Sequence, residues 1–127
     1  RVLGTKPRAA FLLSRYAVPV MTRQGSGTLV FFTSGGAYDG TAQFTAFCAA
    51  EHAVRGFVAA LAKEVEPHGI RVAHIMPVGG VRREGAADQS TLIDPNDLAE
   101  AVLFLASQSR GGRTNEIAIH APAPEQG

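Results

Sequence analysis

The sequence predicts an α/β domain in which helices cover both faces of a parallel sheet. Segments with helical spacing of apolar residues alternate with short β-prone runs, in the order helix, strand, helix, strand, helix, strand. The first strand run is continuously β-prone, as expected of a strand buried on both faces, and the second is also interpreted as a buried strand. A length of 127 residues suits one domain. Together these observations predict a doubly wound architecture with about three strands and three helices.

The first helix is predicted over residues 8–21, where apolar side chains recur every three or four positions. Pro19 is expected to kink or end this helix near its last turn. A Gly-Ser-Gly turn leads to the first strand, 28–33, and a Gly-rich loop is expected over 34–40. Because the strand reads Thr-Leu-Val-Phe-Phe-Thr, it suits the interior of a sheet, and we expect another segment beside it.

The second helix is predicted over 42–66, before a Pro-His-Gly stop, and the second strand over 70–76. A polar loop then leads to Asp94 and Pro95, the N-cap and first residue of a third helix. The third strand is predicted over 116–120. The Pro-rich tail, 121–127, is expected to fray.

Composition excludes several classes of protein. A net charge of +1 lacks the basic footprint of a dedicated nucleic-acid binder. No apolar run reaches the roughly 18 residues that a membrane span requires. Cys48 is the single cysteine, which fits a reducing compartment and predicts a cytoplasmic location. It and the four histidines show no metal-ligand spacing.

Four stretches, taken together, resemble the C-terminal half of a short-chain dehydrogenase/reductase. They are similar, in the family's order, to its fifth strand with the active-site serine loop, the helix of its Tyr-x-x-x-Lys motif, the start of its sixth strand, and its penultimate helix: residues 25–35, 50–57, 67–75 and 94–107. The resemblance implies a three-layer, Rossmann-like fold. It also implies that residues 1–127 form an incomplete domain, without the N-terminal half that binds the cofactor.

The resemblance places catalytic positions at Ser34, Phe47 and Glu51. In the family, serine holds the substrate oxygen, tyrosine exchanges the proton, and lysine lowers the tyrosine pKa and holds the nicotinamide ribose. Phe47 stands at the tyrosine position and has no ionisable proton. Glu51 stands at the lysine position and places an anion where the family has a cation. Tyr38 is the phenol nearest to Ser34 and is the candidate replacement acid.

Each of these residues also has a structural interpretation. Ser34 is either a site residue or a loop serine that bonds local backbone. Glu51 is either a general base or, as we favour, the partner of Arg55 one helical turn later. Tyr38 in a Gly-rich loop is more often a packing or surface residue.

The resemblance implies NAD or NADP as cofactor, with contacts from Pro77, Gly79, Gly80 and Val81 after the sixth family strand. This segment departs from the family's Pro-Gly loop, and the sequence lacks the Gly-x-Gly-x-x-Gly phosphate turn. Cofactor binding by this chain alone is therefore not expected.

The sequence thus indicates an oxidoreductase-family protein without the usual Tyr/Lys hydride-transfer chemistry. Two alternatives stay open: a non-catalytic subunit or binding scaffold, and a repurposed acid-base enzyme that uses Ser34, Tyr38 or Glu51. The resemblance further implies a homo-oligomer formed through helices 8–21 and 42–66, and a small-molecule ligand.

Overall fold

The computed structural model describes residues 2–85 and 89–123, which form helices and strands in alternation. In chain order the elements are α1 (Val2–Gln24), β1 (Gly27–Phe32), α2 (Gly35–Tyr38), α3 (Thr45–Val65), the 3₁₀ turn η1 (Glu66–His68), β2 (Ile70–Val78), α4 (Pro95–Ser107) and β3 (Glu116–His120). The three predicted strands and three longer helices are all present. Of the predicted frayed tail, residues 124–127 lie outside the described residues.

The strands form one parallel sheet in the order β1-β2-β3. Leu29 pairs with Val72, and Ile75 pairs with Phe32 on one side and Ile117 on the other. Parallel neighbours with helical crossovers confirm the predicted α/β class.

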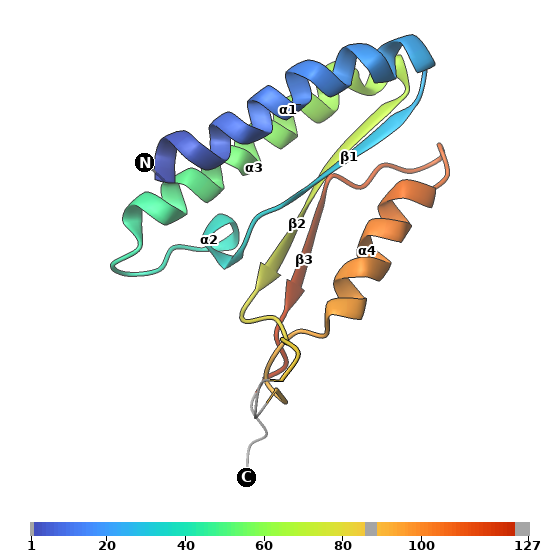
Figure 1. The fold of residues 1–127 in the computed structure, drawn as a ribbon. Coiled ribbons are helices and arrows are strands. Elements are labelled where there is room, and N and C mark those ends of the chain that lie inside the picture. The colour runs from blue at the N-terminus through green and yellow to red at the C-terminus, as the bar shows by residue number, and fades with distance from the viewer. Residues whose placement is uncertain (1, 86–88, 124–127) are drawn as a thin grey trace.

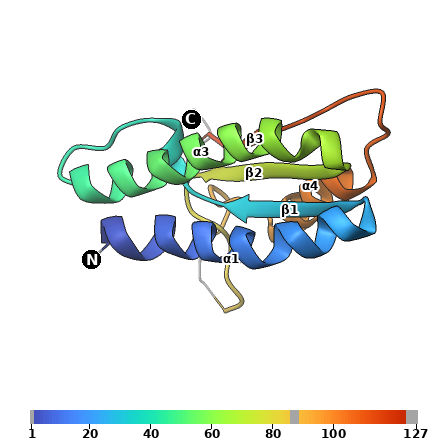
Figure 2. The same cartoon turned by 90° about the horizontal axis from the view of Figure 1, so that it is seen from above.

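Helices lie on both faces of the sheet, so the molecule has three layers (Figures 1 and 2). On one face α1 and α3 run side by side, and buried residues of α3 meet those of β1 and β2 in one core cluster: Leu29, Val54, Val58, Ala62, Val65, Ile70 and Val72. On the other face Leu105 of α4 packs with Ala73 and Ile75 of β2. Each large apolar side chain buried in this way contributes roughly 1.5–3 kcal/mol by leaving water.

The ends of α1 and α3 differ from the sequence expectation. Proline inside a helix removes one backbone hydrogen bond, yet α1 continues through Pro19 to Gln24. Ala17, Val18 and Met21 around Pro19 pack against the core cluster, and this burial offsets the lost bond. In the segment just before α3, Gln43 adopts a left-handed φ of 72°. The helix α3 therefore begins at Thr45 rather than at residue 42.

β1 lies at the edge of the described sheet. The sequence predicts a strand buried on both faces, but only Leu29 in β1 is buried and Phe32 is 43% exposed. The reason is tertiary: one side of β1 pairs with β2, and no strand among the described residues pairs with the other side.

The turn into β2 requires glycine at position 69. Gly69 has a left-handed φ of 78°, and a Cβ there would lie 2.3 Å from the carbonyl oxygen of Gly25. The backbones that enter β1 and β2 therefore approach more closely than any side chain would allow.

Candidate functional site

The carboxyl ends of β1 and β2 bring the sequence-predicted residues together at one edge of the sheet (Figure 1). Ser34 follows β1 after one residue, and Gly79 and Gly80 follow β2 directly. A Cβ added to Gly35 would lie 3.6 Å from the side chain of Val78, so the start of α2 lies against the end of β2. In doubly wound folds this edge is where ligands bind.

Ser34 is the N-cap of a short helix rather than part of an irregular loop. The predicted loop over 34–40 contains α2, and Ser34 Oγ accepts a hydrogen bond from the amide of Gly36 at 3.1 Å. The hydroxyl then donates to Oε2 of Glu51 at 3.0 Å. Both the site interpretation and the structural interpretation of Ser34 therefore have a geometric basis, because one hydroxyl caps α2 and contacts Glu51.

Glu51 is completely buried, and its partner is not the one expected. Oε1 of Glu51 lies 2.6 Å from Nζ of Lys6, an ion pair whose geometry falls outside that of a hydrogen bond. Arg55 forms its ion pair with Glu116 instead, so the predicted Glu51–Arg55 pair is wrong. The physical reason is orientation: Glu51 faces inward toward α1, and burial makes a cation necessary there.

Lys6 is the site residue that the sequence analysis missed. It lies on α1, 45 positions before Glu51 in the sequence, and its side chain is 42% exposed while it reaches the buried carboxylate. No local spacing signals this pair, because the packing of α1 against α3 alone brings the two residues together. The result is a chain of contacts from Lys6 through Glu51 to Ser34.

Phe47 fits closely against the loop that carries Ser34. A Cβ added to Gly36 would lie 3.0 Å from the Phe47 ring and 3.2 Å from Cγ of Glu51, so a side chain at position 36 would press on both residues. Phe47 also packs edge-on against Phe44, with ring centroids 6.5 Å apart. The residue is 38% exposed, and its ring offers no group that exchanges a proton.

Tyr38 ends α2 and lies on the surface, where the residue is 47% exposed. Its ring packs edge-on against His120 at the end of β3, with centroids 4.8 Å apart. A phenol is thus present on the same edge of the sheet as Ser34.

The segment expected to contact a cofactor is tied to another loop. Pro77 lies within β2 and pairs with Ile119, while Val81 forms a parallel bridge with Ile93. The carbonyl of Gly80 accepts from the Ile93 amide at 2.8 Å, and the Arg82 amide donates to the Ile93 carbonyl at 2.9 Å. The Gly80 carbonyl and the Arg82 amide are thus engaged within the chain.

A second network of polar side chains joins α3 to α2, β2 and β3. Arg55 makes a bidentate pair with Glu116 at 2.9 and 3.1 Å and donates to the carbonyl of Ala37 at 2.8 Å. His74, fully buried, lies between Glu116 at 3.0 Å and Thr33 at 3.3 Å. The hydrogen bond from Arg55 holds the pKa of Glu116 below its usual value.

The described part of the chain carries neither a metal cluster nor a membrane-spanning helix. Within residues 2–85 and 89–123, no three His, Cys, Asp or Glu side chains are grouped so that they could hold a metal ion. In the same ranges, no helix has the length and apolarity that crossing a membrane requires.

The parallel sheet, the three layers and the polar residues at the carboxyl edge define a Rossmann-like α/β domain. The sequence matches the family model described as "short chain dehydrogenase" over residues 1–90. This chain belongs to the short-chain dehydrogenase family.

A curated relative agrees with this assignment, and solved structures share the fold. An uncharacterized oxidoreductase of Staphylococcus aureus strain N315 is 32% identical over 107 residues, which cover 81% of this chain and 46% of the relative. An acetoin dehydrogenase from Enterobacter cloacae has a similar structure, with a TM-score of 0.80 at 23% identity over 94% of this chain and 52% of that one. A metagenomic short-chain oxidoreductase in complex with NADP gives a TM-score of 0.76 at 22% identity, over 95% and 50%. The chain spans about half the length of the curated relatives it matches.

Proposed function

We propose that this chain is an oxidoreductase-family domain that does not perform the family's tyrosine-dependent hydride transfer and serves as a non-catalytic, ligand-binding scaffold. The observation that carries this proposal is the closed arrangement of Lys6, Glu51 and Ser34. In it the serine hydroxyl donates to a buried carboxylate rather than toward the open edge of the sheet.

The identities of the neighbouring residues support the same conclusion. Phe47 cannot exchange a proton, and general acid-base help is worth about 10²–10⁴-fold in rate. The anion of Glu51 would oppose a phenolate at position 47. Its charge is already compensated by Lys6, so that cation is committed to an ion pair.

The nicotinamide cofactor of the family fits these residues poorly. The Gly80 carbonyl and the Arg82 amide are bonded to Ile93, and Glu51, at the family's lysine position, is a buried anion. A nicotinamide ribose and its pyrophosphate favour cations and free amides. We therefore propose that NAD or NADP is not bound by these 127 residues alone.

Restoring the motif tests the proposal. Phe47→Tyr with Glu51→Lys recreates the family's pattern, but a lysine at 51 would face Lys6, so Lys6→Gln is added. In the full encoded polypeptide with NADPH and a generic ketone, we expect no turnover from the parent or from Phe47→Tyr or Glu51→Lys alone. The triple variant should gain about 100-fold or more over background.

Ser34→Ala in the triple variant is the control, since it should remove the gain. Parent turnover equal to that of the triple variant would contradict the proposal and would mean that another residue supplies the proton.

A repurposed acid-base enzyme is the second candidate, and one observation favours it. Tyr38 lies on the same sheet edge as Ser34, and its ring is half exposed. If the parent does show turnover, Tyr38→Phe should abolish it under this alternative and leave it unchanged under any other.

We also propose a homo-oligomer formed through α1 and α3, as the family resemblance implies. The side of α1 that carries exposed apolar residues supports this: Leu13 (57%), Tyr16 (72%) and Val20 (44%) share one side of the helix and are all exposed. Burial of such a stripe against a second copy would remove it from water.

A further inference from the structure

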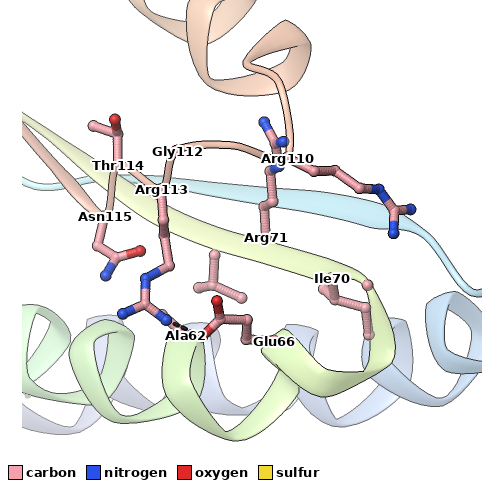
Figure 3. Close-up of a pocket in the computed structure, with 11 residues that line it drawn as sticks. Ala62, Glu66, Ile70, Arg71, Arg110, Gly112, Arg113, Thr114 and Asn115 are labelled. Carbon is pink, nitrogen blue, oxygen red and sulfur yellow. Dashed lines mark hydrogen bonds and ion pairs between the residues drawn. The ribbon is translucent and has the colours of Figure 1, made fainter.

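The carboxylate of Asp39 contacts the backbone of its own loop rather than a distant side chain. Elsewhere charged groups meet across elements: at a cavity of about 220 Å³ where β2 begins, Arg113 points toward Glu66 and forms an ion pair with it (Figure 3). Asp39, by contrast, directly follows α2, and its Oδ1 accepts a hydrogen bond from the amide of Gly40 at 2.7 Å. The carboxyl group therefore lies against the nitrogen of the next peptide bond.

This contact brings an electrophile and a nucleophile of the same chain together. The carboxyl carbon of Asp39 is one bond away from Oδ1, and two groups held in a near-attack arrangement react from a separation of roughly 3–3.5 Å. Attack by the Gly40 nitrogen on that carbon closes a five-membered ring. Because both groups belong to adjacent residues, no encounter between molecules is needed.

Asp39 and Gly40 are also open to solvent. All residues from 38 to 47 are exposed, and a Cβ built on Gly40 would meet no atom within 4 Å. Ring closure turns the backbone of Asp39 away from its extended ψ of 170°, a rotation that an exposed loop permits. Water therefore reaches the ring, and no side chain at position 40 shields the nitrogen.

We propose that the Asp39–Gly40 peptide bond is a site of spontaneous isomerisation to isoaspartate. From the protonated carboxyl group, the Gly40 nitrogen bonds to Cγ of Asp39, and the carboxyl hydroxyl leaves with the amide proton as water. Water then adds to one of the two ring carbonyl carbons. Addition at the Asp39 backbone carbonyl breaks its bond to nitrogen, so the chain runs through Cβ and Cγ, whereas addition at Cγ restores aspartate. No oxidant, reductant or other co-reactant enters either step.

Two further aspartates of the described residues serve as comparisons within the same chain. Asp94 precedes Pro95, whose nitrogen carries no hydrogen to release. Asp97 precedes Leu98 inside α4, where the helix fixes the backbone and a branched side chain stands beside the nitrogen. Of these three, Asp39 alone is followed by glycine, and we expect isomerisation there and not at the other two.

The modification would change the connection between two elements of the carboxyl-edge site. It adds one methylene to the backbone between α2, which Ser34 caps, and α3, which carries Glu51. Arg55 holds α2 through the Ala37 carbonyl at 2.8 Å, and α3 is fixed in the core. The segment 40–44 must therefore absorb the added length.

Incubation of the full encoded polypeptide in neutral buffer at physiological temperature tests this proposal. Samples taken over several weeks are digested, and the peptide that contains residues 39 and 40 is sequenced by electron-transfer fragmentation, which distinguishes the two linkages. Methylation by a protein isoaspartyl methyltransferase measures isoaspartate independently. We expect it to accumulate at position 39 at a rate within about tenfold of that in the free peptide of residues 36–44.

Matched variants assign the reaction to this pair. Gly40→Ala places a methyl group beside the nucleophile and should slow accumulation about tenfold. Asp39→Glu would have to close a larger ring and should give no product. Gly56→Ala adds a methyl group at an exposed position of α3 with open space around it, and should leave the rate unchanged.

Conversion of the free peptide without conversion of the folded polypeptide would overturn the proposal, because it would show that the loop holds Asp39 in its extended conformation. Equal rates for the parent and Gly40→Ala, or equal accumulation at Asp97, would overturn it as well. Thermal unfolding shows which variants are folded, and free peptides with the same substitutions provide the comparison without a fold.

Discussion

At the residue scale, the unusual feature is a fully buried carboxylate with a half-exposed cation. Removing an ionised carboxylate from water costs several kcal/mol unless a partner and hydrogen bonds compensate it. Glu51 receives both, from Lys6 and from Ser34. This residue therefore links the position of α1 to the loop after β1, and the stability of that link depends on one cation.

Removal of that cation should destabilise the domain. Lys6→Met keeps the apolar stem but leaves Glu51 buried without a counter-charge, and we expect a loss of about 1–3 kcal/mol in the free energy of unfolding. This is below the roughly 3–5 kcal/mol of a fully buried pair because Lys6 is 42% exposed. Urea denaturation measures the loss.

Two controls isolate the charge effect. In a Glu51→Gln background, Lys6→Met should cost less than about 0.5 kcal/mol, since the buried charge is gone. Lys63→Met removes the other lysine of the chain, which is exposed on α3, and should be nearly neutral. Equal costs for Lys6→Met in both backgrounds would show that the ion pair contributes nothing.

At the element scale, one arginine fastens three elements together. Arg55 extends from α3 to the carbonyl of Ala37 in α2 and to Glu116 at the start of β3. Glu116 then contacts the buried His74 of β2. The short helix α2, which has four residues and could not persist alone, is thus held against the sheet beside the site.

This network predicts a pH dependence. Arg55 lowers the pKa of Glu116 from 4.5, so its contribution to stability is full above about pH 4.5 and is lost as pH falls through the lowered value. For a pair about one-third exposed we expect about 0.5–1 kcal/mol. Arg55→Met should remove this contribution, so the difference in the free energy of unfolding between parent and variant should shrink on acidification.

Glu116→Gln is the matched control, because it keeps a hydrogen-bonding group but does not titrate. Arg55→Met in that background should cost the same free energy of unfolding at about pH 7 and about pH 3. A parent-to-variant difference that grows on acidification would contradict the expected sign.

At the scale of the whole molecule, an open strand edge is combined with an exposed apolar helix face. Phe32 of β1 is 43% exposed, and beside it a groove of about 180 Å³ runs between β1 and α1. The unpaired backbone N–H and C=O groups of an edge strand can form hydrogen bonds with a strand of another chain. In relatives about twice as long, more chain is available to cover such surfaces.

We therefore expect the isolated 127-residue chain not to be a monodisperse monomer. Light scattering after size-exclusion chromatography measures its mass. Phe32→Lys should increase the monomer fraction if association occurs through β1, and Tyr16→Lys should do so if it occurs through α1 and α3. A single monomeric species, with the β1 edge accessible and no aggregation, would show this reasoning to be wrong.

The isolated chain should also fail to bind NAD or NADP usefully. The altered Pro-Gly loop after β2 and the missing phosphate turn predict dissociation constants weaker than about 100 μM, that is, less favourable than about −5.5 kcal/mol. Calorimetric titration of the 127-residue chain checks this, with the same titration of a complete family member as control. Tighter binding would mean that the segment around Gly80 rearranges.

The order of elements was predictable because it depends on local patterns. Apolar periodicity, the Asp94–Pro95 helix start and the Pro-His-Gly stop each act within a few residues, and the structure confirms the helices and the parallel strands that they predict. The positions of Ser34, Phe47 and Glu51 near one another also followed from the family resemblance. The short helix α2 was missed, because its stability comes from the Ser34 cap and from Arg55 rather than from its Gly-rich sequence.

The sequence by itself determined the fold class, the family, and the chemical fact that position 47 has no proton to exchange, since these depend on composition and local order. Only the tertiary structure decided which charges meet. The pairing of Lys6 with Glu51 and the pairing of Arg55 with Glu116 join residues far apart in the chain. Such pairs leave no local signal, because ionic partners are selected by the packing of helices and strands and by the cost of burying an unpaired charge.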